Sequence, residues 1–214
     1  FSQEKLDHMT ALGARLTLVP CEGGLTTKKL ILDMIEAARG LSHEPHTYWT
    51  DQLNNYDSIA GYYPLGEEIW NQTKGEIDAF VHCVGTAASS RGVATVLKRH
   101  KPSIKIVAVE PAESPVLLGG QAGPHKIEGV GIGYTPPLWE PTLVDEILPV
   151  RTDDAMDMAR RVAREEALFA GTSSGANVVA AIQVAKRLGP DAKVVTLMAD
   201  SGLKYLSTDV YRRR

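Results

Sequence analysis

Residues 78–90 of this 214-residue chain read DAFVHCVGTAASS. The apolar run at 78–83 predicts a buried strand, and the small and hydroxyl-bearing residues that follow predict the start of a helix over 86–99. A buried strand that passes through a short turn into a helix is the repeating unit of α/β proteins with a parallel sheet. This stretch therefore predicts the centre of an α/β fold.

The same alternation of strand-like and helix-like segments continues on both sides of this unit. Further strands are predicted at 16–20, 104–110, 146–150 and 193–198, and further helices at 3–12, 65–73, 153–168 and 174–188. Another helix is predicted to run through 30–39, with Thr26 or Thr27 as its cap and Gly40 as its stop. Residues 41–63 are predicted as loop with a short strand, and 111–141 as a long loop. The fold class is α/β, with a mostly parallel sheet flanked by helices.

Composition excludes several classes of protein. With 43% hydrophobic and 23% charged residues, the chain has the make-up of a globular protein rather than a disordered one. A net charge of −3 supplies no basic field for nucleic acid or an anionic membrane. No apolar run reaches the ~18 residues of a membrane span. Two cysteines favour a reducing compartment, so we expect a cytoplasmic protein whose partners include neither nucleic acid nor membrane.

The turn at 85–89, GTAAS, is a candidate site for an anion. Ligands of parallel sheets bind beyond the carboxyl ends of the strands, where this turn lies. Its small residues allow a close approach of backbone N–H groups, and the start of the helix adds partial positive charge. The turn lacks the lysine of a P-loop, which argues against a nucleoside triphosphate. The residues alone fit both a phosphate cradle and an ordinary capped start of a helix.

Two other polar turns are predicted at the same edge of the sheet. Residues 171–176, GTSSGA, open a helix that Ser173 or Ser174 can cap, and 199–202, ADSG, follow the last strand. The string at 171–175 also matches the G-x-S-x-G pattern of a hydrolase nucleophile. That interpretation fails, because a helix precedes the serine and no histidine follows Ser173 in the sequence.

A dinucleotide loop and a metal site are not supported. The glycines at 129, 131 and 133 lack G-x-G-x-x-G spacing, since Tyr134 stands where the last glycine belongs. The histidines show no H-x-x-x-H spacing, and Cys21 and Cys83 lie far apart, so no metal site is predicted. The acidic pairs at 153–154 and 165–166 are interpreted as charges on helices rather than as catalytic pairs.

Four longer strings carry a resemblance to a known family. They are VEPAESPVLLGG at 109–120, GPHKIEGVGIGY at 123–134, ARRVAREEALFAGTSSGA at 159–176 and DSGLKYLST at 200–208. Together, in this order and spacing, they resemble the cysteine synthase (O-acetylserine sulfhydrylase) family. These are pyridoxal-phosphate enzymes of fold type II, the tryptophan synthase β group. The resemblance extends over essentially the whole chain.

The resemblance implies pyridoxal 5′-phosphate as the cofactor and assigns roles by position. The turn at 85–89 matches the family loop around the cofactor phosphate, and Ser173 matches the serine that hydrogen-bonds the pyridine nitrogen. A neutral hydroxyl there leaves the ring nitrogen largely unprotonated, which favours β-elimination. The implied cofactor-binding residues are Gly85, Thr86, Ala87, Ala88, Ser89 and Ser173, and the implied substrate-binding residues are Gln52 and Gly129.

Three positions depart from the family pattern. The phosphate loop is usually G-T-G-G-T, whereas this chain has G-T-A-A-S. The two alanines preserve the N–H contacts only if neither adopts a positive φ. Glu128 stands where glutamine is common and Lys204 where arginine is common, so these positions bear on the choice of substrate.

The family's Schiff-base lysine and its Thr-Ser-Gly-Asn substrate loop lie N-terminal to the helix that begins near Gln3. No lysine of this sequence matches that position, so no catalytic residue is predicted here. We expect residues 1–214 to form one main cofactor-binding α/β domain, with 1–50 including part of a smaller N-terminal domain. On this interpretation the sequence is a portion of a longer enzyme, and the portion alone lacks the amine for catalysis.

The resemblance implies β-replacement on O-acetylserine or a similar β-activated serine, which forms cysteine in amino-acid biosynthesis. It also implies a homodimer that binds a small amino-acid substrate. Two alternatives within the group are a cystathionine β-synthase and a serine/threonine dehydratase-like lyase. A third is a non-catalytic module that binds pyridoxal phosphate or another anion.

Overall fold

A computed structural model describes residues 2–20 and 27–212, and within them the chain forms one four-stranded sheet. The strand order is β3-β2-β1-β4, and all three neighbouring pairs are parallel. The strands are β1 (Ala79–Cys83), β2 (Lys105–Pro111), β3 (Glu146–Val150) and β4 (Val194–Thr196). This confirms the predicted fold class, an α/β arrangement with a parallel sheet.

Strand β1 lies inside the sheet and is buried along its whole length. In the register, Val81 pairs with Val107 of β2 on one side and with Thr196 of β4 on the other. A parallel strand covered on both faces reads as a continuous apolar run, which is why residues 78–83 were recognisable in the sequence. The turn after β1 consequently emerges from the middle of the sheet.

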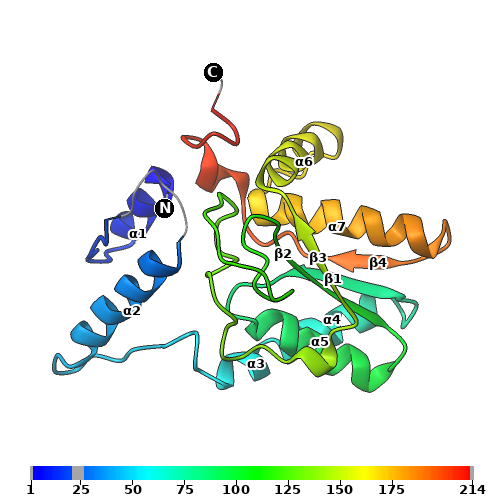
Figure 1. Cartoon of the computed structure of the whole chain (residues 1–214), viewed down its shortest axis with the longest axis horizontal. Helices are drawn as coiled ribbons and strands as arrows, with labels where there is room; N and C mark the ends of the chain where they lie inside the picture. Colours follow the sequence, from blue (N-terminus) through cyan, green and yellow to red (C-terminus); the bar gives the residue numbers. More distant parts are fainter. Residues whose placement is uncertain (1, 21–26, 213–214) are drawn as a thin grey trace.

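Helices cover both faces of the sheet (Figure 1). On one face α7 packs its alanines Ala176 and Ala180 against Val81 and Val107. On the other face α5 packs Val93 and Leu97 against Phe80, and α4 lies beside α5. The α-helices are α1 (Gln3–Ala11), α2 (Lys28–Ser42), α3 (Asp57–Gly61), α4 (Tyr63–Gln72), α5 (Ala88–His100), α6 (Thr152–Glu165) and α7 (Thr172–Leu188), and the 3₁₀ turns are η1 (Pro141–Leu143) and η2 (Gly202–Tyr205).

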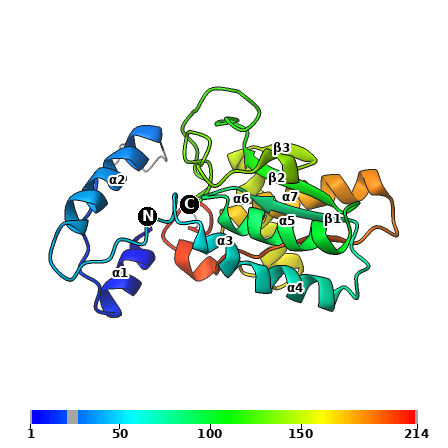
Figure 2. The same cartoon turned by 90° about the horizontal axis from the view of Figure 1, so that it is seen from below.

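Helices α1 and α2 stand apart from the layered sheet, as Figures 1 and 2 show from two directions. Neither helix contains a buried residue. Helix α1 is tied to the C-terminal part of the chain through Glu4, whose carboxylate accepts hydrogen bonds from Ser207 N at 2.6 Å and Ser207 Oγ at 2.7 Å. The assignment of residues 1–50 to a smaller domain stays a prediction.

The sequence predictions for β1, β2, β3 and the helices that flank them are confirmed within a few residues. Three local predictions are wrong. Residues 16–20 form no strand, because no other described segment supplies a ladder of backbone hydrogen bonds for them. Gly40 does not end its helix, since α2 continues to Ser42, and 41–63 contains α3 in place of a short strand.

Thr27 caps α2 by accepting a hydrogen bond from Leu30 N at 3.2 Å, whereas Thr26, the other predicted cap, lies outside the described residues. Within the described ranges, no helix combines the length and apolar character that crossing a bilayer demands.

Candidate cofactor and substrate site

The turn that follows β1 is packed so closely that only glycine fits at its first position. A Cβ on Gly85 would lie 2.4 Å from the carbonyl oxygen of Gly129. The predicted phosphate-binding turn and the predicted substrate-facing segment therefore touch at this point. Gly131 N also donates a hydrogen bond to Val84 O at 3.2 Å, which fixes the second segment against the first.

Helix α5 begins at Ala88, two residues later than predicted, because Ala87 turns the chain in the left-handed region with φ of 70°. The condition given for the two alanines, that neither adopts a positive φ, is therefore not met at Ala87. Such a conformation costs an L-residue about 1–2 kcal/mol. Ala87 is only 1% exposed and packs in a cluster with Val84 and Leu138, so tertiary packing holds it there.

Donors at the start of α5 are available to a ligand. In the described part of the chain, neither Ser89 N nor Ser90 N receives a hydrogen-bond partner, while Ala88 N makes a long bond of 3.4 Å to Thr86 Oγ1. The first N–H groups of a helix have no partner within the helix and carry partial positive charge. The turn at 85–89 can thus supply N–H groups and the hydroxyls of Thr86 and Ser89 to an anion.

The start of α7 presents two adjacent serines with different surroundings. Ser174 Oγ accepts a hydrogen bond from Ala199 N at 2.9 Å, so this hydroxyl has a structural partner. Ser173 is 6% exposed, and its hydroxyl makes no hydrogen bond to any described residue. The hydroxyl oxygen is not among the fully enclosed atoms that lack a partner in the described chain, so it is available to hydrogen-bond a ligand. Neither serine caps α7, because Gly171 occupies that position.

Three chain segments meet around these groups at the carboxyl end of β1. Cys83 Sγ contacts the backbone oxygen of Ser173 at 3.5 Å, which places the start of α7 beside the turn at 85–89. Glu128 N donates to Thr172 Oγ1 at 3.3 Å, which joins the segment containing Gly129 to the same helix start. The predicted residues at 85–89, 129 and 173 are therefore brought together.

Gln52 is not brought into this group. It is exposed in a turn before α3, and no hydrogen bond links it to another of the predicted site residues in the described part of the chain. Its neighbour Leu53 is buried and anchors the turn. Its role near a substrate carboxylate stays a prediction.

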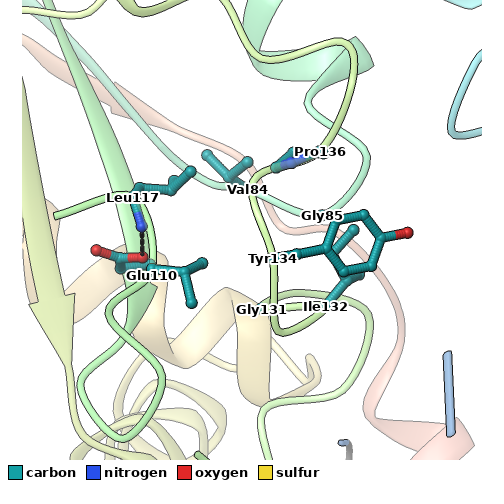
Figure 3. Close-up of a pocket in the computed structure, with 9 residues that line it drawn as sticks. Val84, Gly85, Glu110, Leu117, Gly131, Ile132, Tyr134 and Pro136 are labelled. Atoms are coloured by element: carbon teal, nitrogen blue, oxygen red, sulfur yellow. Dashed lines mark hydrogen bonds between the residues drawn. The ribbon is translucent and has the colours of Figure 1, made fainter. Parts of the chain in front are cut away.

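A small, mostly apolar pocket lies against Gly85, the first residue of the same turn (Figure 3). Its lining is Val84, Gly85, Glu110, Val116, Leu117, Gly131, Ile132, Tyr134 and Pro136. Glu110 is 2% exposed, and its carboxylate accepts hydrogen bonds from Leu117 N at 2.8 Å and Leu118 N at 3.1 Å. Burial raises the pKa of Glu110, while these two bonds oppose the rise. Glu110 thus fixes the long loop rather than facing a ligand.

Two buried polar residues behind the turn, His82 and Asn177, were not predicted from the sequence. His82 Nε2 lies 3.0 Å from Ser89 Oγ, and His82 Nδ1 lies 3.3 Å from Asn177 Nδ2. They are 8% and 0% exposed. A histidine inside the apolar run FVHC was the available signal, but its partner lies far away in the sequence and could not be identified.

A charged cluster next to Ser173 was also missed. Lys5 of α1 forms an ion pair with Glu128 at 2.5 Å and lies 3.1 Å from the hydroxyl of Tyr205. Tyr205 donates a hydrogen bond to Asp200 at 2.7 Å, and burial raises the pKa of Tyr205. The third predicted turn, 199–202, thereby joins the same edge. Lys204 contributes its backbone oxygen, which accepts a hydrogen bond from Ser2.

The family model described as "Pyridoxal-phosphate dependent enzyme" matches residues 1–200. The chain therefore belongs to the family of pyridoxal-phosphate dependent enzymes.

Among its relatives, the cysteine synthase of Staphylococcus aureus strain Mu50 is 42% identical over 213 residues, which are 98% of this chain and 66% of that protein. The crystal structure of a cysteine synthase from Entamoeba histolytica matches with a TM-score of 0.88 at 37% identity and covers 100% of this chain and 62% of that one. An O-acetylserine dependent cystathionine β-synthase from Helicobacter pylori matches at 0.87 with 34% identity, over 99% of this chain and 68% of that one. The chain thus spans about two thirds of its relatives' length. These structures share the fold type II arrangement of a parallel sheet flanked by helices.

The residues present fit pyridoxal 5′-phosphate, the cofactor of this family. At one end, the turn at 85–89 opens a helix and has N–H donors without partners among the described residues, as a bound phosphate requires. At the other end, the Ser173 hydroxyl has no hydrogen-bond partner among the described residues. A ring nitrogen is the type of acceptor that this hydroxyl lacks.

Proposed function

We propose that this chain forms the cofactor-binding part of a cysteine synthase-type enzyme. The reaction is β-replacement on O-acetylserine or a similar β-activated serine, with sulfide or another thiol as the nucleophile. The observation that carries the proposal is the meeting of the turn at 85–89 with the unpartnered Ser173 hydroxyl at the end of β1. The 42% identity to a cysteine synthase supports the same reaction.

When bound, the cofactor acidifies the α-proton of an amino acid and so permits loss of a leaving group from the β-carbon. In the proposal, N–H groups at 86–89 and the hydroxyls of Thr86 and Ser89 hold its phosphate. The Ser173 hydroxyl hydrogen-bonds the ring nitrogen and adds no positive charge there. Gly129, which contacts Gly85, lies in the segment that faces the substrate, and Gln52 lies near the substrate carboxylate.

No lysine of this sequence is assigned the role of the catalytic amine. Lys98 is paired with Asp145 at 2.7 Å and Lys29 with Asp33 at 2.5 Å, and both lie on helices away from the turn at 85–89. The relatives are longer than this chain, and we place the amine among their additional residues. The chain alone is therefore expected to bind the cofactor without turning over substrate.

We also propose a cellular location and an oligomeric state for the enzyme. A homodimer in the cytoplasm, acting in cysteine biosynthesis, is consistent with the resemblance and with the low number of cysteines. Neither nucleic acid nor a membrane is proposed as a partner, since the net charge of −3 supplies no basic field.

A chimera tests the proposed reaction. The additional N-terminal third of the S. aureus cysteine synthase is fused ahead of this chain, and cysteine is measured after addition of O-acetylserine and sulfide. Cysteine formation that is lost in the Ser173→Ala chimera is the expected result. Pyruvate without cysteine would favour a dehydratase-like lyase, and bound cofactor with no product would favour a non-catalytic module.

A further inference from the structure

His82 lies on β1 directly behind Ser89, the last residue of the proposed phosphate cradle. Its ring joins Ser89 Oγ, 3.0 Å from Nε2, to Asn177 of α7, whose Nδ2 is 3.3 Å from Nδ1. His82 and Asn177 are almost completely buried, whereas Ser89 is half-buried. The direction of each of these hydrogen bonds follows from the backbone groups that contact Asn177.

Backbone groups fix the orientation of the Asn177 amide. Cys83 N can only donate, and it lies 2.7 Å from Asn177 Oδ1. Leu197 O can only accept, and it lies 2.8 Å from Asn177 Nδ2. The oxygen and the nitrogen of the amide are therefore assigned without ambiguity. The second hydrogen on Nδ2 then points to His82 Nδ1.

This orientation determines the tautomer of His82. Because Asn177 Nδ2 donates to Nδ1, that ring nitrogen carries no hydrogen. Burial lowers the pKa of His82 to about 4, so the ring is neutral near pH 7 and its single N–H is on Nε2. Nε2 consequently donates to Ser89 Oγ, and the hydrogen of the Ser89 hydroxyl remains available for a different acceptor.

We propose that His82 is a positioning residue that orients the Ser89 hydroxyl to donate its hydrogen to the cofactor phosphate. The inference rests on the proposed function of the turn at 85–89. A bare Nε2 would attract the Ser89 hydrogen, and the lone pairs of the oxygen would then face the anion. The histidine tautomer thus determines whether Ser89 attracts or repels a phosphate.

The test measures binding of pyridoxal 5′-phosphate and of pyridoxal, which lacks the phosphate, by equilibrium dialysis with this chain. The variants are His82→Leu, Ser89→Ala, the double variant and His82→Gln. We expect His82→Leu to lower the affinity for pyridoxal phosphate about tenfold, the size of effect expected when a charge-assisted hydrogen bond is lost. The affinity for pyridoxal should not change. In the Ser89→Ala background, His82→Leu should cause no further loss of affinity. The single variant His82→Gln retains an N–H donor, so it should bind pyridoxal phosphate with most of the wild-type affinity.

Three outcomes would contradict the inference. A loss from His82→Leu that persists in the Ser89→Ala background, or that affects pyridoxal equally, would show a merely structural role. If His82→Leu bound pyridoxal phosphate as tightly as the wild-type chain, His82 would have no role in phosphate binding. If the wild-type chain bound pyridoxal phosphate no more tightly than pyridoxal, the proposed phosphate-binding role of the turn at 85–89 would itself be wrong. This result differs from the other two, which concern His82 alone.

One measurement needs no substitution and so remains decisive if His82→Leu fails to fold. ¹⁵N NMR spectra of the wild-type chain report which ring nitrogen of His82 carries the hydrogen. A hydrogen on Nε2 is expected. A hydrogen on Nδ1 would overturn the inference.

Discussion

Two adjacent residues, Ser173 and Ser174, show how position determines the role of a serine. Both are buried at the start of α7. Ser174 satisfies a backbone N–H of the segment after β4, whereas Ser173 has no hydrogen-bond partner among the described residues. The Ser174 hydroxyl therefore contributes to stability, and the Ser173 hydroxyl is the one that our proposal assigns to the ligand.

Alanine at each position separates these roles. Ser173→Ala should lower affinity for pyridoxal phosphate about fivefold, the equivalent of ~1 kcal/mol for one hydrogen bond, with little change in unfolding free energy. Ser174→Ala leaves Ala199 N without its acceptor and should lower stability by about 1–3 kcal/mol. Dialysis and urea unfolding provide the two readouts. Equal effects of the two substitutions on both readouts would contradict the assignment.

His82 makes stability depend on pH in a defined window. Its pKa in the folded state is about 4, below the ordinary value of 6.5, so the unfolded chain takes up a proton first as the pH falls. The stabilisation is complete above pH 6.5 and is lost as the pH decreases toward 4, by up to about 1.4 kcal/mol for each pH unit. Urea unfolding at intervals across this range should show a steeper decline for wild type than for His82→Gln. Parallel declines would show that the histidine does not titrate as stated.

Gly85 is the one residue of the cradle where a single methyl group should disturb two parts of the site. In Gly85→Ala the new Cβ meets the Gly129 oxygen at 2.4 Å, and backbone on both sides must move. We expect a loss of about 2 kcal/mol in stability and a marked loss of affinity for pyridoxal phosphate. Gly40→Ala is the matched control, because no atom lies within 4 Å of its Cβ and helix propensity should stabilise α2. A Gly85→Ala chain as stable as wild type would refute the close contact.

At the scale of elements, α1 is attached to the site mainly by charge. Lys5 and Glu128 form an ion pair with side chains only 16% and 26% exposed, and Lys5 also lies over the Tyr205 ring. This ion pair joins α1 to the residue next to Gly129. Movement of α1 is therefore coupled to the segment that faces the substrate in our proposal.

Glu128→Gln weakens this attachment, while the hydrogen bonds between Glu4 and Ser207 remain. Without the Glu128 carboxylate its ion pair with Lys5 is lost, and α1, which has no buried residue, should open more often. Hydrogen exchange followed by mass spectrometry should show faster exchange over residues 3–11. Glu36→Gln is the control, since it breaks the exposed Arg39–Glu36 pair on α2 and should leave α1 unchanged. Unaltered protection of α1 in Glu128→Gln would contradict this coupling.

Most elements of the sheet could be predicted from the sequence because their local pattern agrees with their final environment. β1 and β2 are buried on both faces, and their apolar runs show it. Residues 16–20 have a similar local pattern, but the described chain offers them no neighbouring strand. Strand pairing is a long-range property, so the pattern alone gave a wrong prediction there.

At the scale of the molecule, the sheet brings together turns that are far apart in the chain. The sequence indicated that polar turns at 85–89, 171–176 and 199–202 share one edge, because parallel strands end at the same edge. It could not indicate the left-handed Ala87, which depends on packing against Leu138, or the bond between His82 and Asn177. Both follow from contacts between distant segments. The predicted role of Gln52 depends on a surface turn that the sheet does not position.

A crystal structure of this chain with pyridoxal 5′-phosphate would show directly whether the two ends of the proposed site hold the cofactor. We expect the phosphate within hydrogen-bond distance of N–H groups at 86–89 and of Ser89 Oγ, with the pyridine nitrogen at Ser173 Oγ. The cofactor bound elsewhere, or the space between these two groups filled by side chains, would contradict the proposal.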